Sequence, residues 1–156
     1  LKRAEGIQFD AAVFTNLSGE HLDYHETMDR YYQAKKRLFV MENSTASAIN
    51  SDDEWGKKLI RENPGRIVTF GLQPRALVHP LNYVFSRKGI KASVKAPSGV
   101  LDINSPLLGR PNLYNILAAI STALILNIPP PAIEKGIEKL CLKICNLYQS
   151  GLMIKC

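Results

Sequence analysis

Two histidines and two carboxylates lie close together near the beginning of the sequence, directly after an apolar run. Residues 11–14 are Ala-Ala-Val-Phe, and residues 20–25 are Glu-His-Leu-Asp-Tyr-His. An apolar run that ends abruptly in polar residues is typical of a buried strand that delivers side chains at its carboxyl end. Imidazole and carboxylate groups bind divalent ions, but this spacing is much less specific than a zinc motif. His21 is therefore either a metal ligand or a structural hydrogen-bonding residue, and both interpretations stay open.

Lys35 is the next residue of interest, and it falls on a predicted helix over residues 27–41. Thr27 or Ser18 is a suitable cap for this helix. The amphipathic spacing could turn Lys35 back toward the end of the first strand, and the alternative is an ordinary surface lysine. Apolar or aromatic residues that would form the buried face are Met28, Tyr31, Tyr32, Leu38 and Phe39.

Asn50 ends a second predicted strand, over residues 46–50, and Asp52 follows it. An open α/β sheet binds its ligand at the carboxyl ends of its strands, and an amide with a carboxylate suits a purine edge and a ribose hydroxyl. The alternative is that both residues only cap the helix that opens at residues 51–54, with Ser51 or Asp52 as its N-cap.

Asn112 and Asn115 lie three residues apart on one face of a predicted helix that starts at about residue 113, just after Gly109. Glycine permits a close approach of the backbone. The two amides either tie down the start of this helix or contact a nucleotide, and their spacing does not decide between the two.

The order of the elements predicts an α/β fold. Strands over residues 9–14, 46–50 and 66–70 alternate with helices, which indicates a mostly parallel sheet covered by helices. An added small antiparallel β meander is predicted next, and we expect it to be attached to that sheet. Its three strands cover residues 81–86, 90–96 and 100–103, and helices follow over residues 113–127 and 132–140. Beyond residue 140 the sequence has neither clear periodicity nor capping signals.

The composition excludes some classes of protein. The 156 residues, 46% of them hydrophobic, are enough for one domain or a piece of one, and no apolar run approaches the roughly 18 residues of a membrane span. The net charge of +6 is spread along the chain without a long basic run, so we expect neither nucleic acid nor membrane as a partner. Three cysteines without metal-ligand spacing favour a reducing compartment.

Three segments, in the same order along the chain, resemble the central ATP-binding domain of the Mur ligases. Residues 12–25 continuing to Lys35 carry most of the similarity, and within the family they look like the MurE branch, the UDP-N-acetylmuramoyl-tripeptide synthetases. The other segments are Asn-Ser-Asp-Asp at residues 50–53 and Gly-Arg-Pro-Asn-Leu-Tyr-Asn at residues 109–115. We therefore expect residues 1–140 to be the C-terminal part of an incomplete Mur ligase central domain, and residues 141–156 to be a diverged or truncated tail.

The resemblance implies an ATP-dependent ligase of peptidoglycan precursor synthesis. Its partners would be UDP-MurNAc-dipeptide and an amino acid, joined through an acyl phosphate, with ATP and Mg²⁺ as cofactors. The enzyme would be a monomer in the cytoplasm, or in the plastid stroma of a photosynthetic eukaryote. Which amino acid is added is not implied by these residues.

The resemblance also implies roles for particular residues. His21 and Lys35 would be Mg²⁺ ligands, with Lys35 carbamylated so that a cation becomes a carboxylate-like group. Capture of carbon dioxide requires a neutral amine, which a partly buried site favours. Arg3 would contact the UDP-sugar substrate. The residues on the nucleotide side would be Asn50, Asp52, Asn112 and Asn115.

The chain also departs from the family pattern. A glycine-rich phosphate loop ending in Gly-Lys-Thr or Gly-Lys-Ser does not occur in the 156 residues, so we expect it upstream and expect the isolated chain to be inactive. Gly19, Glu20 and Pro111 stand where the family usually has Arg, Asp and Phe. With the cysteine-containing tail, they motivate an alternative: a non-catalytic descendant that keeps the ligase fold as a scaffold or assembly protein.

Overall fold

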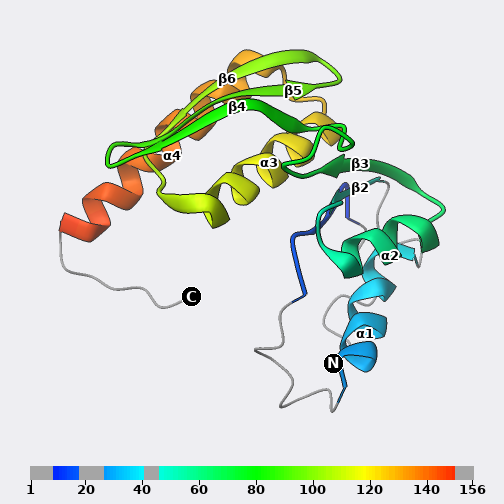
Figure 1. The fold of residues 1–156 in the computed structure, drawn as a ribbon. Helices are drawn as coiled ribbons and strands as arrows, with labels where there is room; N and C mark the ends of the chain where they lie inside the picture. Colours follow the sequence, from blue (N-terminus) through cyan, green and yellow to red (C-terminus); the bar gives the residue numbers. More distant parts are fainter. Residues whose placement is uncertain (1–8, 18–26, 41–45, 150–156) are drawn as a thin grey trace.

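The computed structural model describes residues 9–17, 27–40 and 46–149 (Figure 1). It is a mixed α/β structure, which confirms the predicted fold class. In chain order the elements are β1 (Ala12–Phe14), α1 (Met28–Val40), β2 (Ala46–Asn50), α2 (Glu54–Glu62), β3 (Arg66–Phe70), β4 (His79–Ser86), β5 (Gly89–Ala96), β6 (Gly99–Ser105), α3 (Gly109–Ile125) and α4 (Pro130–Gln149).

The first three strands form a parallel sheet in the order β1-β2-β3. Ala12 pairs with Ser47 and Ala46 pairs with Arg66, so the carboxyl ends of all three strands lie at one edge. The predicted strands over residues 46–50 and 66–70 are confirmed, whereas β1 has only three residues of the predicted six. This edge of the sheet carries the candidate site residues that follow β2.

Side chains on both faces of the parallel sheet are buried, as expected for a parallel sheet covered by helices. On one face, Ala46 and Ala48 belong to the core that α3 covers. On the other face, Ile49 packs with aromatic residues of α1, including the fully buried Tyr32. Side chains alternate between the two faces of a strand, and both faces of this sheet are covered, so all five residues of β2 are buried.

The meander is a second sheet, with the order β4-β5-β6 and antiparallel pairing throughout. One face of β5 and β6 packs against the core that includes α3, and Figure 1 shows α3 and α4 on the same side of this sheet. The expected attachment to the parallel sheet is limited to an isolated parallel bridge between Phe70 and Val78. The antiparallel meander is confirmed, but it is not an extension of the first sheet.

The cap of α2 corrects one prediction. Asp53 is the N-cap, since its carboxylate accepts a hydrogen bond from the Gly56 amide at 2.9 Å. Neither Ser51 nor Asp52 has this role. For α1 the structure agrees with one of the two predicted caps, because the Thr27 hydroxyl accepts a hydrogen bond from the Arg30 amide at 3.3 Å. Ser18 lies outside the described residues.

The last two helices are longer than predicted. Helix α3 starts at Gly109 rather than at residue 113, because Pro111 lies in the first turn, where a missing amide hydrogen breaks no helical hydrogen bond. It ends before Asn127, which has a left-handed backbone with φ of 56°. Helix α4 runs on to Gln149, past the point at which the sequence pattern fails. Within the described ranges, no helix is long and apolar enough to cross a membrane.

Candidate functional site

The carboxylate of Asp52 is the centre of a polar cluster at the carboxyl edge of the parallel sheet. Its Oδ2 atom accepts hydrogen bonds from the Leu72 amide at 2.6 Å and from the Tyr114 hydroxyl at 3.0 Å. Its Oδ1 atom lies 3.4 Å from Nη2 of Arg75, and the same Nη2 donates to the Ser51 carbonyl at 3.3 Å. Asp52 therefore joins the end of β2, the turn after β3 and the first turns of α3.

The turn after β3 approaches this carboxylate closely because residue 71 is glycine. A Cβ atom on Gly71 would lie 2.9 Å from both Cγ and Oδ2 of Asp52, which is closer than two such atoms come in proteins. The Leu72 amide reaches Oδ2 only because of this approach. The side chain of Asp52 is only 14% exposed as a result.

Asn50 is held in place from both sides of its amide group. Its Nδ2 atom donates to the Thr15 carbonyl at 2.8 Å, and its Oδ1 atom accepts from the Asp52 amide at 3.0 Å. The first bond ties the end of β2 to the segment that follows β1. Neither Asn50 nor Asp52 caps α2, so the alternative in which both residues only cap this helix is wrong.

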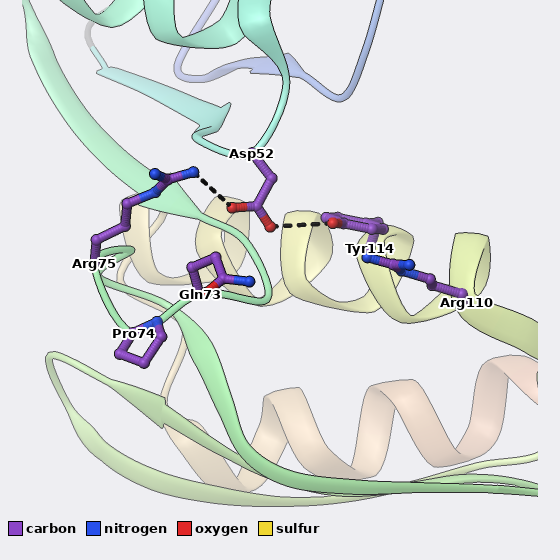
Figure 2. A pocket seen from close by; sticks show the side chains of 6 residues that line it. All are labelled: Asp52, Gln73, Pro74, Arg75, Arg110 and Tyr114. Carbon is purple, nitrogen blue, oxygen red and sulfur yellow. Dashed lines mark hydrogen bonds and ion pairs between the residues drawn. The ribbon is translucent and has the colours of Figure 1, made fainter.

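A pocket of about 460 Å³ opens beside Asp52. Its volume is in the range of small-molecule sites. Figure 2 shows that Arg75 approaches Asp52 from one side and Tyr114 from the other, with the Arg110 side chain beside the Tyr114 ring. The residues that line the pocket are Asp52, Gln73, Pro74, Arg75, Arg110 and Tyr114.

The environment of Tyr114 favours its neutral form. Burial is the main cause that raises the pKa of the phenol above its usual value of 10.0, and the hydrogen bond and negative charge of Asp52 raise it further. The guanidinium group of Arg110 acts in the opposite direction and lowers the pKa. Tyr114 is therefore a hydrogen-bond donor to Asp52 at neutral pH, with the cation of Arg110 close to its hydroxyl.

Asn112 and Asn115 lie on a different face of α3 from the pocket residues. Asn112 is two residues away from both Arg110 and Tyr114, which turns its side chain about 160° from each of them. Its Nδ2 atom donates to the Leu108 carbonyl at 2.8 Å, and Nδ2 of Asn115 lies 3.3 Å from Oδ1 of Asn112. The two amides do tie down the start of the helix, and a nucleotide contact stays a prediction.

The predicted metal site lies mostly outside the described residues. His21 and Arg3 belong to ranges that the structure does not describe, so the pairing of His21 with Lys35 stays a prediction. Lys35 itself is exposed, and its ammonium group lies 5.4 Å from the centre of the Tyr31 ring. In the described part of the chain, His, Cys, Asp and Glu side chains form no group of three or more that could hold a metal ion.

The sequence pattern missed five of the six pocket residues. Four of them, Gln73, Pro74, Arg75 and Arg110, lie in a turn and in a first helical turn, where polar residues are common. Tyr114, the fifth newly identified residue of the cluster, stands between two candidate asparagines. A tyrosine in a helix is usually a packing residue, so only its contact with Asp52, 62 residues earlier, marks it as part of the site.

The structure is an α/β domain with a parallel sheet, helices on both faces and a polar pocket at the carboxyl edge, which is the edge at which open α/β sheets bind their ligands. A family model described as the Mur ligase middle domain matches residues 1–123, and the chain belongs to this family.

Relatives named UDP-N-acetylmuramoyl-L-alanyl-D-glutamate--2,6-diaminopimelate ligase share much of the sequence. The one from Geobacter metallireducens is 40% identical over 144 residues, and the one from Gloeobacter violaceus is 42% identical over 138 residues. Each match covers 88% of this chain and 28% of the relative. The chain thus spans little more than a quarter of the length of these relatives.

Solved structures agree with this assignment. A structure of a UDP-N-acetylmuramoyl-L-alanyl-D-glutamate--2,6-diaminopimelate ligase has 31% identity and a TM-score of 0.77, and the match covers 84% of this chain and 28% of that one. MurF from Acinetobacter baumannii has a TM-score of 0.76 at 21% identity, covering 84% of this chain and 29% of that one. The second likeness concerns the fold alone.

Proposed function

We propose that this chain is part of the ATP-binding domain of a ligase that adds the third amino acid to UDP-MurNAc-dipeptide. One observation carries the proposal furthest. Two of the three segments that resemble the Mur ligases, residues 50–53 and 109–115, meet through the hydrogen bond between Tyr114 and Asp52. They meet at the carboxyl edge of the parallel sheet, where α/β domains bind nucleotides.

The chemistry of this edge fits ATP. Guanidinium groups suit a phosphate-bearing ligand, and amide and carboxylate groups suit a base edge and a ribose. ATP would supply the phosphoryl group that converts the substrate carboxylate into an acyl phosphate. The proposed nucleotide-side residues remain Asn50, Asp52, Asn112 and Asn115.

A magnesium site is the second part of the proposal. His21 and a carbamylated Lys35 would hold Mg²⁺, which would neutralise charge on the phosphates and carboxylates. Arg3 would contact the UDP-sugar substrate. What supports these three roles is the resemblance of residues 3–35 to the family, together with the position of Lys35 on α1, the helix that follows β1. The cytoplasmic location and the monomeric state also stay predictions.

A chimeric enzyme tests whether the chain is competent for ligation. In the Geobacter metallireducens relative, the segment that aligns with this chain would be replaced by this chain. The purified chimera would then be supplied with ATP, Mg²⁺, UDP-MurNAc-dipeptide and 2,6-diaminopimelate, the amino acid in the relative's name. We expect release of ADP together with formation of the tripeptide product.

Variants of the chimera test the metal ligands. Lys35→Ala should abolish ligation, and small carboxylates should restore part of it by replacing the carbamate. Lys36→Ala is the matched control: this neighbouring lysine is not a proposed Mg²⁺ ligand, and its Nζ atom forms an ion pair with Glu62 at 2.9 Å. His21→Ala should raise the Mg²⁺ concentration needed for half-maximal rate. Full activity of the Lys35 variant would remove its role as a ligand.

An inactive chimera that folds normally would favour the other candidate, a non-catalytic scaffold that keeps the ligase fold. Folding would be judged by circular dichroism and by cooperative unfolding. The structure adds no specific observation in favour of the scaffold, since Pro111 is accommodated in the first turn of α3 without loss of the helix.

A further inference from the structure

We propose that the outer edge of β4 pairs with β4 of a second copy of this chain, so that the two antiparallel sheets join into one across a two-fold axis. The inference concerns self-association and is independent of the proposed ligase function. Three features of the described residues carry it: an open sheet edge, uncovered apolar side chains along that edge, and a sequence of β4 that is complementary to itself in antiparallel pairing.

The two edges of the antiparallel sheet are protected unequally. On the β6 edge, α4 packs against the strand, and the Glu134 carboxylate accepts a hydrogen bond from the Asp102 amide at 2.8 Å. On the β4 edge, no strand in the described part of the chain pairs with the outer side of residues 81–86. These six residues contain neither a charge nor a proline, two features with which edge strands prevent pairing. The β4 edge is therefore open to another strand.

The apolar side chains of β4 are exposed on both faces of the sheet. On the face that packs against the helices, Tyr83 and Phe85 lie opposite the buried Ala92 and Ile90 but are themselves 41% and 42% exposed. Their ring centres are 5.3 Å apart, so the two rings form one aromatic patch. On the other face, Val84 is 63% exposed. A strand placed beside β4 would cover all three side chains.

The order of side chains in β4 is symmetric about Val84. Residues 82–86 read Asn-Tyr-Val-Phe-Ser, which is polar, aromatic, valine, aromatic, polar. In an antiparallel pair of two copies centred on Val84, each Tyr83 lies opposite Phe85 of the other copy, and the two valines lie opposite each other on the other face. Aromatic and β-branched pairs at such positions stabilise sheets. Every contact occurs twice, as in an isologous dimer.

The charges next to β4 are compatible with this register. Arg87 and Lys88 follow the strand, and in a pair centred on Val84 they lie opposite Leu81 and Pro80 of the other copy, at the two ends of the interface. Like charges therefore do not meet. One added strand buries less than the roughly 1,600 Å² of a typical stable interface, so we expect a dissociation constant on the order of 10–100 µM. The monomer that the resemblance implies would then be the state at lower concentration.

Sedimentation equilibrium of the 156-residue chain, from about 1 to about 500 µM, tests for this dimer. Val84→Glu should weaken it about tenfold or more, because two carboxylates would meet at the axis. Within its own sheet the new carboxylate would lie opposite Lys91, which favours the fold. Val100→Glu is the matched control, since this valine of β6 is 57% exposed and lies opposite Lys95, away from the β4 edge. It should leave the dimer unchanged.

A charge exchange and a cross-link test the position of the axis. Val84→Lys should also weaken the dimer, and an equimolar mixture with Val84→Glu should restore it, because opposite charges then face each other. Opposite residues of antiparallel strands have Cα atoms about 4.5–5.5 Å apart, a distance that a disulfide spans. In a chain whose three cysteines are replaced by serine, Val84→Cys should form a disulfide-linked dimer on mild oxidation, and Val100→Cys should not.

Loss of the dimer in Val84→Glu, its retention in Val100→Glu and its recovery in the charged mixture would support the proposal. A chain that stays monomeric at the highest concentration overturns it, and the open edge of β4 would then be left for a partner other than a second copy. Association that both glutamate variants retain equally also overturns it. Neither result depends on the chimera, whose failure would count against the ligase function alone.

Discussion

Two substitutions of Asp52, to Ala and to Asn, distinguish the stability contributed by its hydrogen bonds from the stability contributed by its charge. In Asp52→Ala, the Leu72 amide and the Tyr114 hydroxyl both lose their acceptor, and each partly buried donor left without a partner costs about 1–1.5 kcal/mol. The contact with the exposed Arg75 adds at most about 1 kcal/mol. We therefore expect Asp52→Ala to lower the free energy of unfolding by about 2–4 kcal/mol. This is a large part of the stability of a typical domain.

Asp52→Asn is the informative comparison. Its amide oxygen can replace Oδ2 as the acceptor of both hydrogen bonds, and only the contact with Arg75 is lost. The expected loss is below about 1 kcal/mol. Urea unfolding of the three proteins, followed by the fluorescence of Trp55, the single tryptophan, measures the difference. Equal destabilisation by the two substitutions would show that charge, and not the two hydrogen bonds, is what the cluster needs.

Three further predictions concern other parts of the structure. Gly71→Ala should destabilise the fold by about 1–3 kcal/mol, because the new Cβ atom would lie too close to the Asp52 carboxylate. Gly136→Ala in α4 should stabilise the fold by about 0.5–1 kcal/mol, because a Cβ atom at this position would meet no neighbouring atom. Thermal unfolding measures both changes. Burial raises the pKa of both Tyr114 and Tyr32 above 10.0, so the stability that their neutral forms contribute should be fully present below pH 10 and should fall as the pH rises further. A variant with both residues changed to Phe should lose this alkaline dependence, which denaturant titrations at several pH values measure. Hydrogen bonds from Tyr32 and Lys36 lower the pKa of Glu62 below 4.5, so its contribution should be present above pH 4.5 and lost in more acidic solution, and Glu62→Gln should flatten that acid dependence.

The secondary structure could be predicted where the signal was local. Residues 46–50 are a short run of small, β-capable residues, and residues 66–70 are rich in β-branched and aromatic residues and are followed by Gly71; the structure has both strands at the predicted bounds. The start of α3 was misplaced because Gly-Arg-Pro resembles a loop, although proline is well suited to a first helical turn. The continuation of α4 beyond residue 140 was missed because the sequence there has no clear period.

The candidate site depends even more on contacts that a local sequence pattern does not report. Ser51, Asp52 and Asp53 are all good N-cap residues, and the sequence alone cannot tell which one caps α2. Asp53 has this role because Asp52 is used elsewhere, by the Leu72 amide 20 residues away and by the Tyr114 hydroxyl 62 residues away. Contacts at such separations decide the assignment, and no local pattern reports them.

The two faces of α3 constrain how one nucleotide could contact all of the proposed residues. Asp52 and Arg110 line the pocket, whereas Asn112 points about 160° away from Arg110 around the helix axis. A small group in the pocket cannot reach both faces at once. A ligand that contacts both must therefore pass across the first turn of α3, with one part beside Asp52 and another beside Asn112. Since a nucleotide has a base and a phosphate chain joined through a ribose, it has the length and the two distinct ends that this arrangement requires.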